Sequence, residues 1–169
     1  MRSRVGSAKG AVVFTKGYID GVIVKNLTKN ADERGWLMEV FREDEMERRY
    51  MPVMSYISVT QENITRGPHE HVHQADYFCF LGPSNFKIYM WDNRKESLTY
   101  MAMQVIFAGE DAPKSVLIPP GVVHAYKNVG GKPGMVVNSP NKLFAGPGKK
   151  EPVDEIRHED DPATIFQLD

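Results

Sequence analysis

The stretch RGPHEHVHQADYF, residues 66–78, holds three of the five histidines of this 169-residue chain within five positions. These histidines recur at every second position, so on a β-strand their side chains would point to the same face. A second stretch, LIPPGVVHAYKN at residues 117–128, leads from a Pro-Pro-Gly turn into a strand that begins near His124. Imidazoles that point into a protein interior need polar partners. The two stretches therefore predict a polar cluster if the histidines point inward, and a surface turn if they do not.

Short apolar runs follow one another from Ala11 onward, and Gly, Pro, Asn or Asp separates most of them. The runs are rich in β-branched and aromatic residues, which favours many short strands with little helix, in a sandwich or a barrel. REDEMERRYM, residues 42–51, is charged and helix-prone, and it predicts the one short helix. We expect an all-β fold in a single domain at residues 11–169, preceded by a flexible arm at residues 1–10.

Composition restricts the classes of function. With 41% hydrophobic and 25% charged residues and a net charge of -1, the chain lacks the long-range charge that favours binding to nucleic acid or an anionic membrane. Its single cysteine, Cys79, excludes an intrachain disulfide and is typical of a reducing compartment. No apolar run has the length of a membrane span or of a secretion-signal core. We expect a cytoplasmic protein with neither nucleic-acid nor membrane partners.

The second histidine stretch has the form P-x-G-x-x-H-x-x-x-N and resembles the second motif of the cupin superfamily. The first stretch resembles the first cupin motif, with Asp76 in place of the usual glutamate. The resemblance implies a cupin-type jelly-roll barrel of antiparallel strands, and in cupins such motifs hold a divalent metal, here on His69, His71, Asp76 and His124. Asp76 joins the histidines only if a bulge or loop falls between residues 72 and 75. The alternative is an exposed loop from which His69 alone points inward.

Four longer motifs narrow the comparison to one family. They are ADERGWLMEVFRED (31–44), NITRGPHEH (63–71), WDNRKESLTY (91–100) and IPPGVVHAYKN (118–128). Their order and spacing are similar to those of the dTDP-4-dehydrorhamnose 3,5-epimerases, and the resemblance extends from about Tyr18 to Leu168. It implies a homodimeric jelly roll that binds a nucleotide-activated 4-keto-6-deoxysugar and inverts carbons beside the ketone, with no cofactor required.

The resemblance also implies a role for individual residues. His69 would be the base that removes the proton, a task that suits a neutral imidazole because it titrates near neutral pH. Arg34 and Arg66 would hold the substrate or its diphosphate, since a guanidinium group matches phosphate oxygens. Glu39 and His124 would line the same pocket.

Three positions depart from the family pattern. Asp76 stands where the family has a lysine that stabilises the enolate oxygen, and a carboxylate there would repel the developing charge. NSPNKLF, residues 138–144, stands where the family has a proton-donating tyrosine, and it supplies Lys142 as a substrate-binding residue. The aspartate that orients the family's base has no counterpart before Asp169, so we expect Asp76 to orient His69 and raise its basicity.

These observations leave three hypotheses. The leading one is a sugar-nucleotide epimerase or isomerase that acts on a dTDP-4-keto-6-deoxyhexose or a similar activated sugar by proton abstraction next to the ketone. The second is a metal-dependent cupin isomerase or oxygenase, in which Zn, Fe, Mn or Ni takes the place of the lost lysine as a Lewis acid. The third is a jelly roll that binds a sugar nucleotide without turnover.

Overall fold

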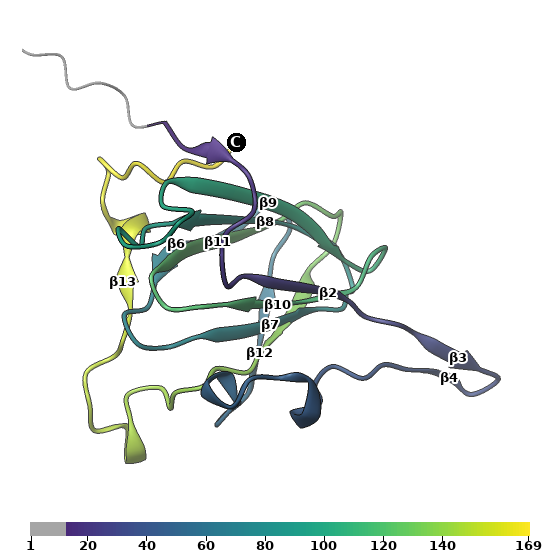
Figure 1. Cartoon of the computed structure of the whole chain (residues 1–169). Helices are drawn as coiled ribbons and strands as arrows, with labels where there is room; N and C mark the ends of the chain where they lie inside the picture. The colour runs from purple at the N-terminus through teal and green to yellow at the C-terminus, as the bar shows by residue number, and fades with distance from the viewer. Residues whose placement is uncertain (1–12) are drawn as a thin grey trace, which may run out of the picture.

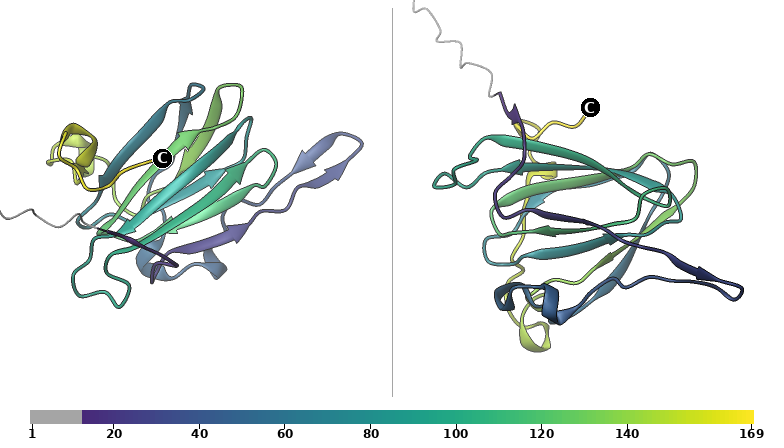
Figure 2. Two further views of the ribbon diagram at one scale, coloured as in Figure 1. Left: turned by 90° about the horizontal axis from the view of Figure 1, so that it is seen from above. Right: turned by 45° about the vertical axis from the view of Figure 1, so that its right-hand side comes forward.

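A computed structural model describes residues 13–169, which form two β-sheets that face each other as a jelly roll (Figure 1; Figure 2). The six-stranded sheet contains, in spatial order, β1 (Thr15–Lys16), β9 (Ala102–Gly109), β8 (Asn85–Asp92), β11 (Val122–Asn128), β6 (Thr65–Glu70) and β13 (Ile156–Arg157). The five-stranded sheet contains β2 (Ile23–Asn26), β10 (Lys114–Ile118), β7 (Asp76–Phe80), β12 (Gly134–Asn138) and β5 (Tyr56–Thr60). Apart from the parallel pair β1 and β9, neighbouring strands are antiparallel, so the predicted fold class is confirmed.

Smaller elements surround the two sheets. A hairpin of β3 (Asn30–Asp32) and β4 (Gly35–Leu37) projects from the body, at the right of Figure 1. The remaining elements are the 3-10 turns η1 (Glu43–Glu45), η2 (Arg48–Tyr50), η3 (Pro147–Lys149) and η4 (His158–Asp160). Within residues 13–169, no helix is both long and apolar enough to cross a membrane.

The helix predicted at residues 42–51 is wrong, because this stretch forms only the two separate 3-10 turns η1 and η2. A ten-residue helix is marginal on its own, and Pro52 directly after the stretch disfavours helical backbone at its last residue. Tyr50 is the only buried residue of the two turns, so tertiary packing adds little to a helical face here. The arm predicted at residues 1–10 lies outside the described residues.

Aromatic side chains fill the space between the sheets. Phe78, Phe80 and Phe86 surround the ring of Tyr126 with centroid distances of 5.5 to 5.8 Å, in the edge-on geometry that aromatic pairs favour. The outer face of the six-stranded sheet is covered as well, because Phe166 packs against Trp91. Phe166 belongs to the C-terminal segment, residues 139–169, which runs back along the body (Figure 1).

The approach of β6 to β11 positions the histidines. The register pairs His69 directly with His124, and a strand irregularity follows before the next pair. Gly67 has a φ angle of +82°, and a Cβ atom at this position would lie 2.5 Å from the carbonyl oxygen of His124. Only glycine fits this backbone without displacement. The glycine of the Arg-Gly-Pro-His sequence therefore lets the two histidine-bearing strands come together.

Candidate functional site

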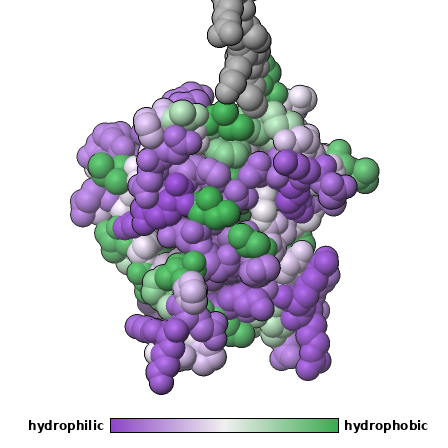
Figure 3. All heavy atoms as spheres, turned by 90° about the vertical axis from the view of Figure 1, so that its left-hand side faces the viewer, coloured by the Kyte–Doolittle hydropathy of each residue, from purple (hydrophilic) through white to green (hydrophobic). Residues whose placement is uncertain are grey.

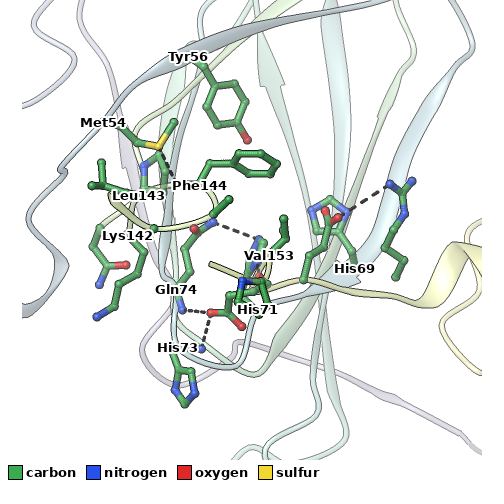
Figure 4. A pocket seen from close by; sticks show the side chains of 18 of the residues that line it. Met54, Tyr56, His69, His71, His73, Gln74, Lys142, Leu143, Phe144 and Val153 are labelled. Atoms are coloured by element: carbon green, nitrogen blue, oxygen red, sulfur yellow. Dashed lines mark hydrogen bonds and ion pairs between the residues drawn. The ribbon is translucent and has the colours of Figure 1, made fainter. Parts of the chain in front are cut away.

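A pocket of about 1200 Å³ opens beside β5 and β6 and is closed on one side by the C-terminal segment (Figure 4). Four of the predicted site residues line it, namely Arg66, His69, His71 and Lys142. Figure 3 shows the side of the molecule that carries β13, where hydrophilic surface surrounds separate apolar patches. The lining of the pocket combines apolar side chains with charged and histidine side chains.

His69, His71 and His124 form a histidine cluster at the base of this pocket. Each offers a ring nitrogen, and these atoms lie within 4.8 Å of one another. The rings of His69 and His124 are nearest, with centroids 4.5 Å apart, as expected for direct cross-strand neighbours. His71 lies just beyond the end of β6 and is only 9% exposed, so the interpretation of this stretch as an exposed loop is wrong. His73 does lie exposed on the following turn.

Asp76 faces the histidine cluster from the opposite sheet. A turn separates β6 from β7, so the interruption predicted between residues 72 and 75 is present. Oδ2 of Asp76 lies 3.0 Å from Nε2 of His71 and 3.3 Å from Nε2 of His124, while Oδ1 accepts hydrogen bonds from Asn138 and Gln74. Burial alone would raise the pKa of Asp76, but the contacts with the two histidines outweigh it and lower this pKa below its usual range. Asp76 is therefore a buried carboxylate.

His69 has a different environment from its two neighbours. Asp76 contacts His71 and His124, so it does not take the predicted role of orienting His69. Burial, together with the nearby His124 and His71, lowers the pKa of His69 to about 2. His69 is therefore unprotonated at neutral pH, which is the state that a base requires.

The C-terminal segment fixes His71. The carboxylate of Asp154 accepts hydrogen bonds from the backbone N–H groups of residues 72–74 at 2.8 to 2.9 Å, and its backbone carbonyl contacts Nδ1 of His71. Burial disfavours the imidazolium, but Asp76 and the Asp154 carbonyl outweigh it and raise the pKa of His71 to about 9. His71 and Asp76 therefore form a buried ion pair at neutral pH, with each charge compensating the other.

Arg34 and Glu39 lie away from the pocket. Arg34 sits at the tip of the projecting hairpin, with its side chain 84% exposed and paired with Asp32. Glu39 is bound to Arg42 at 3.1 Å. A single copy of the chain does not bring these two predicted substrate-binding residues to the histidine cluster.

Sequence reasoning missed two pocket residues. Arg157 lines the pocket and lies directly opposite His69 in the pairing of β13 with β6. Tyr56 lines it from β5, and its hydroxyl accepts a hydrogen bond from Asn138 at 2.9 Å. Tyr56 lies in MSYIS, residues 54–58, where the family that the sequence resembles has a Q-x-N-x-S stretch, and this difference was the available signal for Tyr56. The contact of Arg157 depends on a long-range strand pairing that no local pattern predicts.

The donor atoms of the histidine cluster also fit a metal ion. Oδ2 of Asp76 and Nε2 of His124 are buried and have no aligned hydrogen-bond partner among the described residues. Nδ1 of His71 and Nδ1 of His124 each contact a backbone carbonyl, an arrangement that directs Nε2 inward as in metal-ligating histidines. His69, His71 and His124 could together hold Zn, Fe, Mn or Ni, which accept imidazole and carboxylate ligands, and Asp76 lies beside two of the three.

The jelly roll and its histidine-lined pocket define a cupin-type protein. The family model for dTDP-4-dehydrorhamnose 3,5-epimerase matches residues 16–138. The chain is 37% identical over 128 residues to the probable low-salt glycan biosynthesis epimerase Agl13 of Haloferax volcanii, a match that covers 75% of this chain and 81% of that protein. It is 35% identical over 115 residues to the spore coat polysaccharide biosynthesis protein SpsL of Bacillus subtilis, covering 68% and 75%.

A solved structure supports the fold. The dTDP sugar isomerase from Desulfovibrio desulfuricans G20 superimposes with a TM-score of 0.75 at 18% identity, covering 89% of this chain and 91% of that one. At 18% identity this structure shows only that the fold is shared. The family model and the two more similar sequences show which family the chain belongs to. The chain belongs to the dTDP-4-dehydrorhamnose 3,5-epimerase family, a family of isomerases.

The buried ion pair makes stability depend on pH. The pKa of His71 is about 9 in the folded protein and about 6.5 for a free histidine, so the stabilisation is fully present below pH 6.5 and is lost as pH rises through 9. We expect the free energy of unfolding in urea to fall by about 1 kcal/mol or more between pH 6.5 and 9. His71→Gln should flatten this dependence, whereas His73→Gln, at an exposed position, should preserve it. A wild-type stability that stays constant over this range would contradict the ion pair.

Proposed function

We propose that the pocket binds a dTDP-4-keto-6-deoxyhexose, or a similarly activated sugar, and epimerises a carbon beside its ketone. The observation that carries this proposal is the position of His69 in the lining of a large pocket, in a chain that belongs to this epimerase family. A volume of about 1200 Å³ exceeds that of most small-molecule pockets, so it has room for a nucleotide joined to a sugar.

The proposed reaction begins with transfer of the proton beside the ketone to the imidazole of His69. The electrons of the broken C–H bond form the carbon–carbon double bond of an enolate, and the negative charge moves to the ketone oxygen. Cationic side chains of the pocket suit the diphosphate. Arg66 is held in place for this task, because its guanidinium donates to Oγ1 of Thr60 at 2.9 Å and to the carbonyl of Val59 at 2.8 Å.

Proton exchange with solvent tests the role of His69. In deuterated water with dTDP-4-keto-6-deoxyglucose, we expect NMR to show deuterium entering C3 or C5, at a rate at least about 100-fold lower in His69→Ala. His73→Ala removes an exposed histidine of the same stretch and should retain the wild-type rate. Unchanged exchange in His69→Ala would assign the base elsewhere. Binding of dTDP by a wild-type protein that shows no exchange would favour the non-catalytic binder.

A metal-dependent isomerase or oxygenase is the second candidate, favoured by the ring nitrogens of His69, His71 and His124, which lie within 4.8 Å of one another. An ion held by the histidine cluster and Asp76 would act as a Lewis acid on the ketone. This candidate predicts about one equivalent of metal in protein purified without chelator, measured by elemental analysis and lost in His71→Ala. Metal-free protein that exchanges the substrate proton at full rate would exclude it.

We propose that the protein is a homodimer joined along β5, which is an edge strand among the described residues. Its outward side chains Ile57 and Val59 are 64% and 49% exposed, and apolar strand edges are commonly covered by a partner. A further hypothesis, that the run AVVF at residues 11–14 adds an edge strand to a second subunit, falls partly outside the described residues.

Sedimentation equilibrium tests the dimer. We expect a mass of two chains at micromolar concentration, and a mass of one chain for Ile57→Asp, because a carboxylate in an apolar interface is costly to bury. Leu98→Asp makes the same kind of change at a loop position that is 99% exposed, and it should leave the mass unchanged. A monomeric wild type, or an Ile57→Asp protein that remains dimeric, would contradict this interface.

A cytoplasmic location stays part of the proposal. Burial raises the pKa of the free thiol of Cys79 to about 12, so it remains unreactive, and an unpaired cysteine is typical of reducing compartments. The net charge of -1 likewise favours a small-molecule substrate over a nucleic acid or a membrane surface.

A further inference from the structure

Inversion of a carbon requires two proton transfers on opposite faces. If the base that removes the proton also returns it, the configuration is retained. A second group must therefore deliver a proton from the other side of the sugar. The segment at residues 138–144, which would carry the family's donor, has no tyrosine in this chain.

Tyr56 lies on the wall that faces His69. It begins β5 in the five-stranded sheet, whereas His69 belongs to β6 in the six-stranded sheet. The strand alternates, so Tyr56 points to the same side as Ser58, which contacts the hydroxyl of the core residue Tyr126 at 3.0 Å. Figure 4 shows Tyr56 and His69 entering the pocket from separate strands, with the Tyr56 hydroxyl directed inward.

The Tyr56 hydroxyl is positioned with its proton available. It accepts a hydrogen bond from Nδ2 of Asn138 at 2.9 Å, and the same Nδ2 donates to Oδ1 of Asp76 at 2.8 Å. The structure shows no bond among the described residues in which this hydroxyl is the donor. Burial raises the pKa of Tyr56, so the group keeps its proton at neutral pH. Its residue remains 46% exposed, so a bound sugar can reach it.

A second tyrosine of the pocket is a poorer donor. Tyr126 is only 4% exposed, packs among the rings of the core and shares its hydroxyl with Ser58. Its hydroxyl is therefore less available to a bound sugar than that of Tyr56.

We propose that Tyr56 is the acid that protonates the enolate on the face opposite His69. The inference rests on the proposed function. The electron pair of the enolate oxygen re-forms the ketone, the electrons of the carbon–carbon double bond take the proton from the Tyr56 hydroxyl, and tyrosinate remains. The imidazolium of His69 and the tyrosinate then exchange protons with solvent, so the sugar is isomerised with no change in its composition.

Tyr56→Phe separates this role from that of the base. In deuterated water, loss of the C3 or C5 proton signal from the unconverted sugar reports abstraction by His69, whereas signals of a new epimer report inversion. We expect Tyr56→Phe to keep exchange within a few-fold of wild type while epimer formation falls at least about 100-fold. Tyr100→Phe makes the same chemical change outside the pocket at a residue that is 42% exposed, and it should keep both rates.

The remaining outcomes overturn the inference in distinct ways. Normal epimer formation by Tyr56→Phe would show that another group is the acid. Loss of exchange and inversion together, with dTDP binding retained, would make Tyr56 a residue that positions the substrate. A wild-type protein that shows neither exchange nor inversion would overturn the proposed function itself, and the inference with it.

Discussion

The buried carboxylate of Asp76 is the interaction on which the site depends. A carboxylate removed from water costs several kcal/mol unless it is paired and hydrogen-bonded. Asp76, 1% exposed, meets this requirement with two imidazoles on one oxygen and two amides on the other. Because it lies at the first position of β7, it links the two sheets at the floor of the pocket. Removal of its partners on either side would leave an uncompensated charge in the core.

Asp76 also gives the histidines of the cluster different pKa values. His71, held between Asp76 and the Asp154 carbonyl, has a raised pKa, whereas His69 has a lowered pKa because burial and its two histidine neighbours outweigh the influence of Asp76. Chemically identical side chains two positions apart thus differ in charge at neutral pH. The C-terminal segment contributes to this difference, because Asp154 fixes the turn that carries His71.

The strands were predictable, because period-two patterns and a Pro-Pro-Gly turn are local signals. The meeting of His69 with His124 was predictable only from the resemblance of the two stretches to the cupin motifs. The need for an interruption before Asp76 was predictable as well. The partners of Asp76 were not, since they depend on which strands face each other across the barrel. The helix prediction for residues 42–51 rested on propensity, and tertiary packing provided too little to sustain it. The roles of Arg157 and Asp154 depend on how a long segment returns to the pocket, which no local pattern encodes.

From the sequence alone, Asp76 in place of the family's lysine predicts repulsion of the enolate charge. The structure shows that this repulsion is largely cancelled. An isolated carboxylate beside a forming enolate would raise the barrier by charge repulsion. Here the negative charge of Asp76 is offset by the imidazolium of His71, at 3.0 Å, so the pair presents little net charge to the pocket. The lost lysine therefore leaves the enolate without a dedicated cation and adds no strong repulsion. Arg157, which pairs opposite His69 on β13, and Arg66, on the same strand as His69, are further cationic groups that line the pocket. Stabilisation of the enolate by the charge of these arginines, which also attract the diphosphate, would link substrate binding to the acidity of the proton that His69 removes.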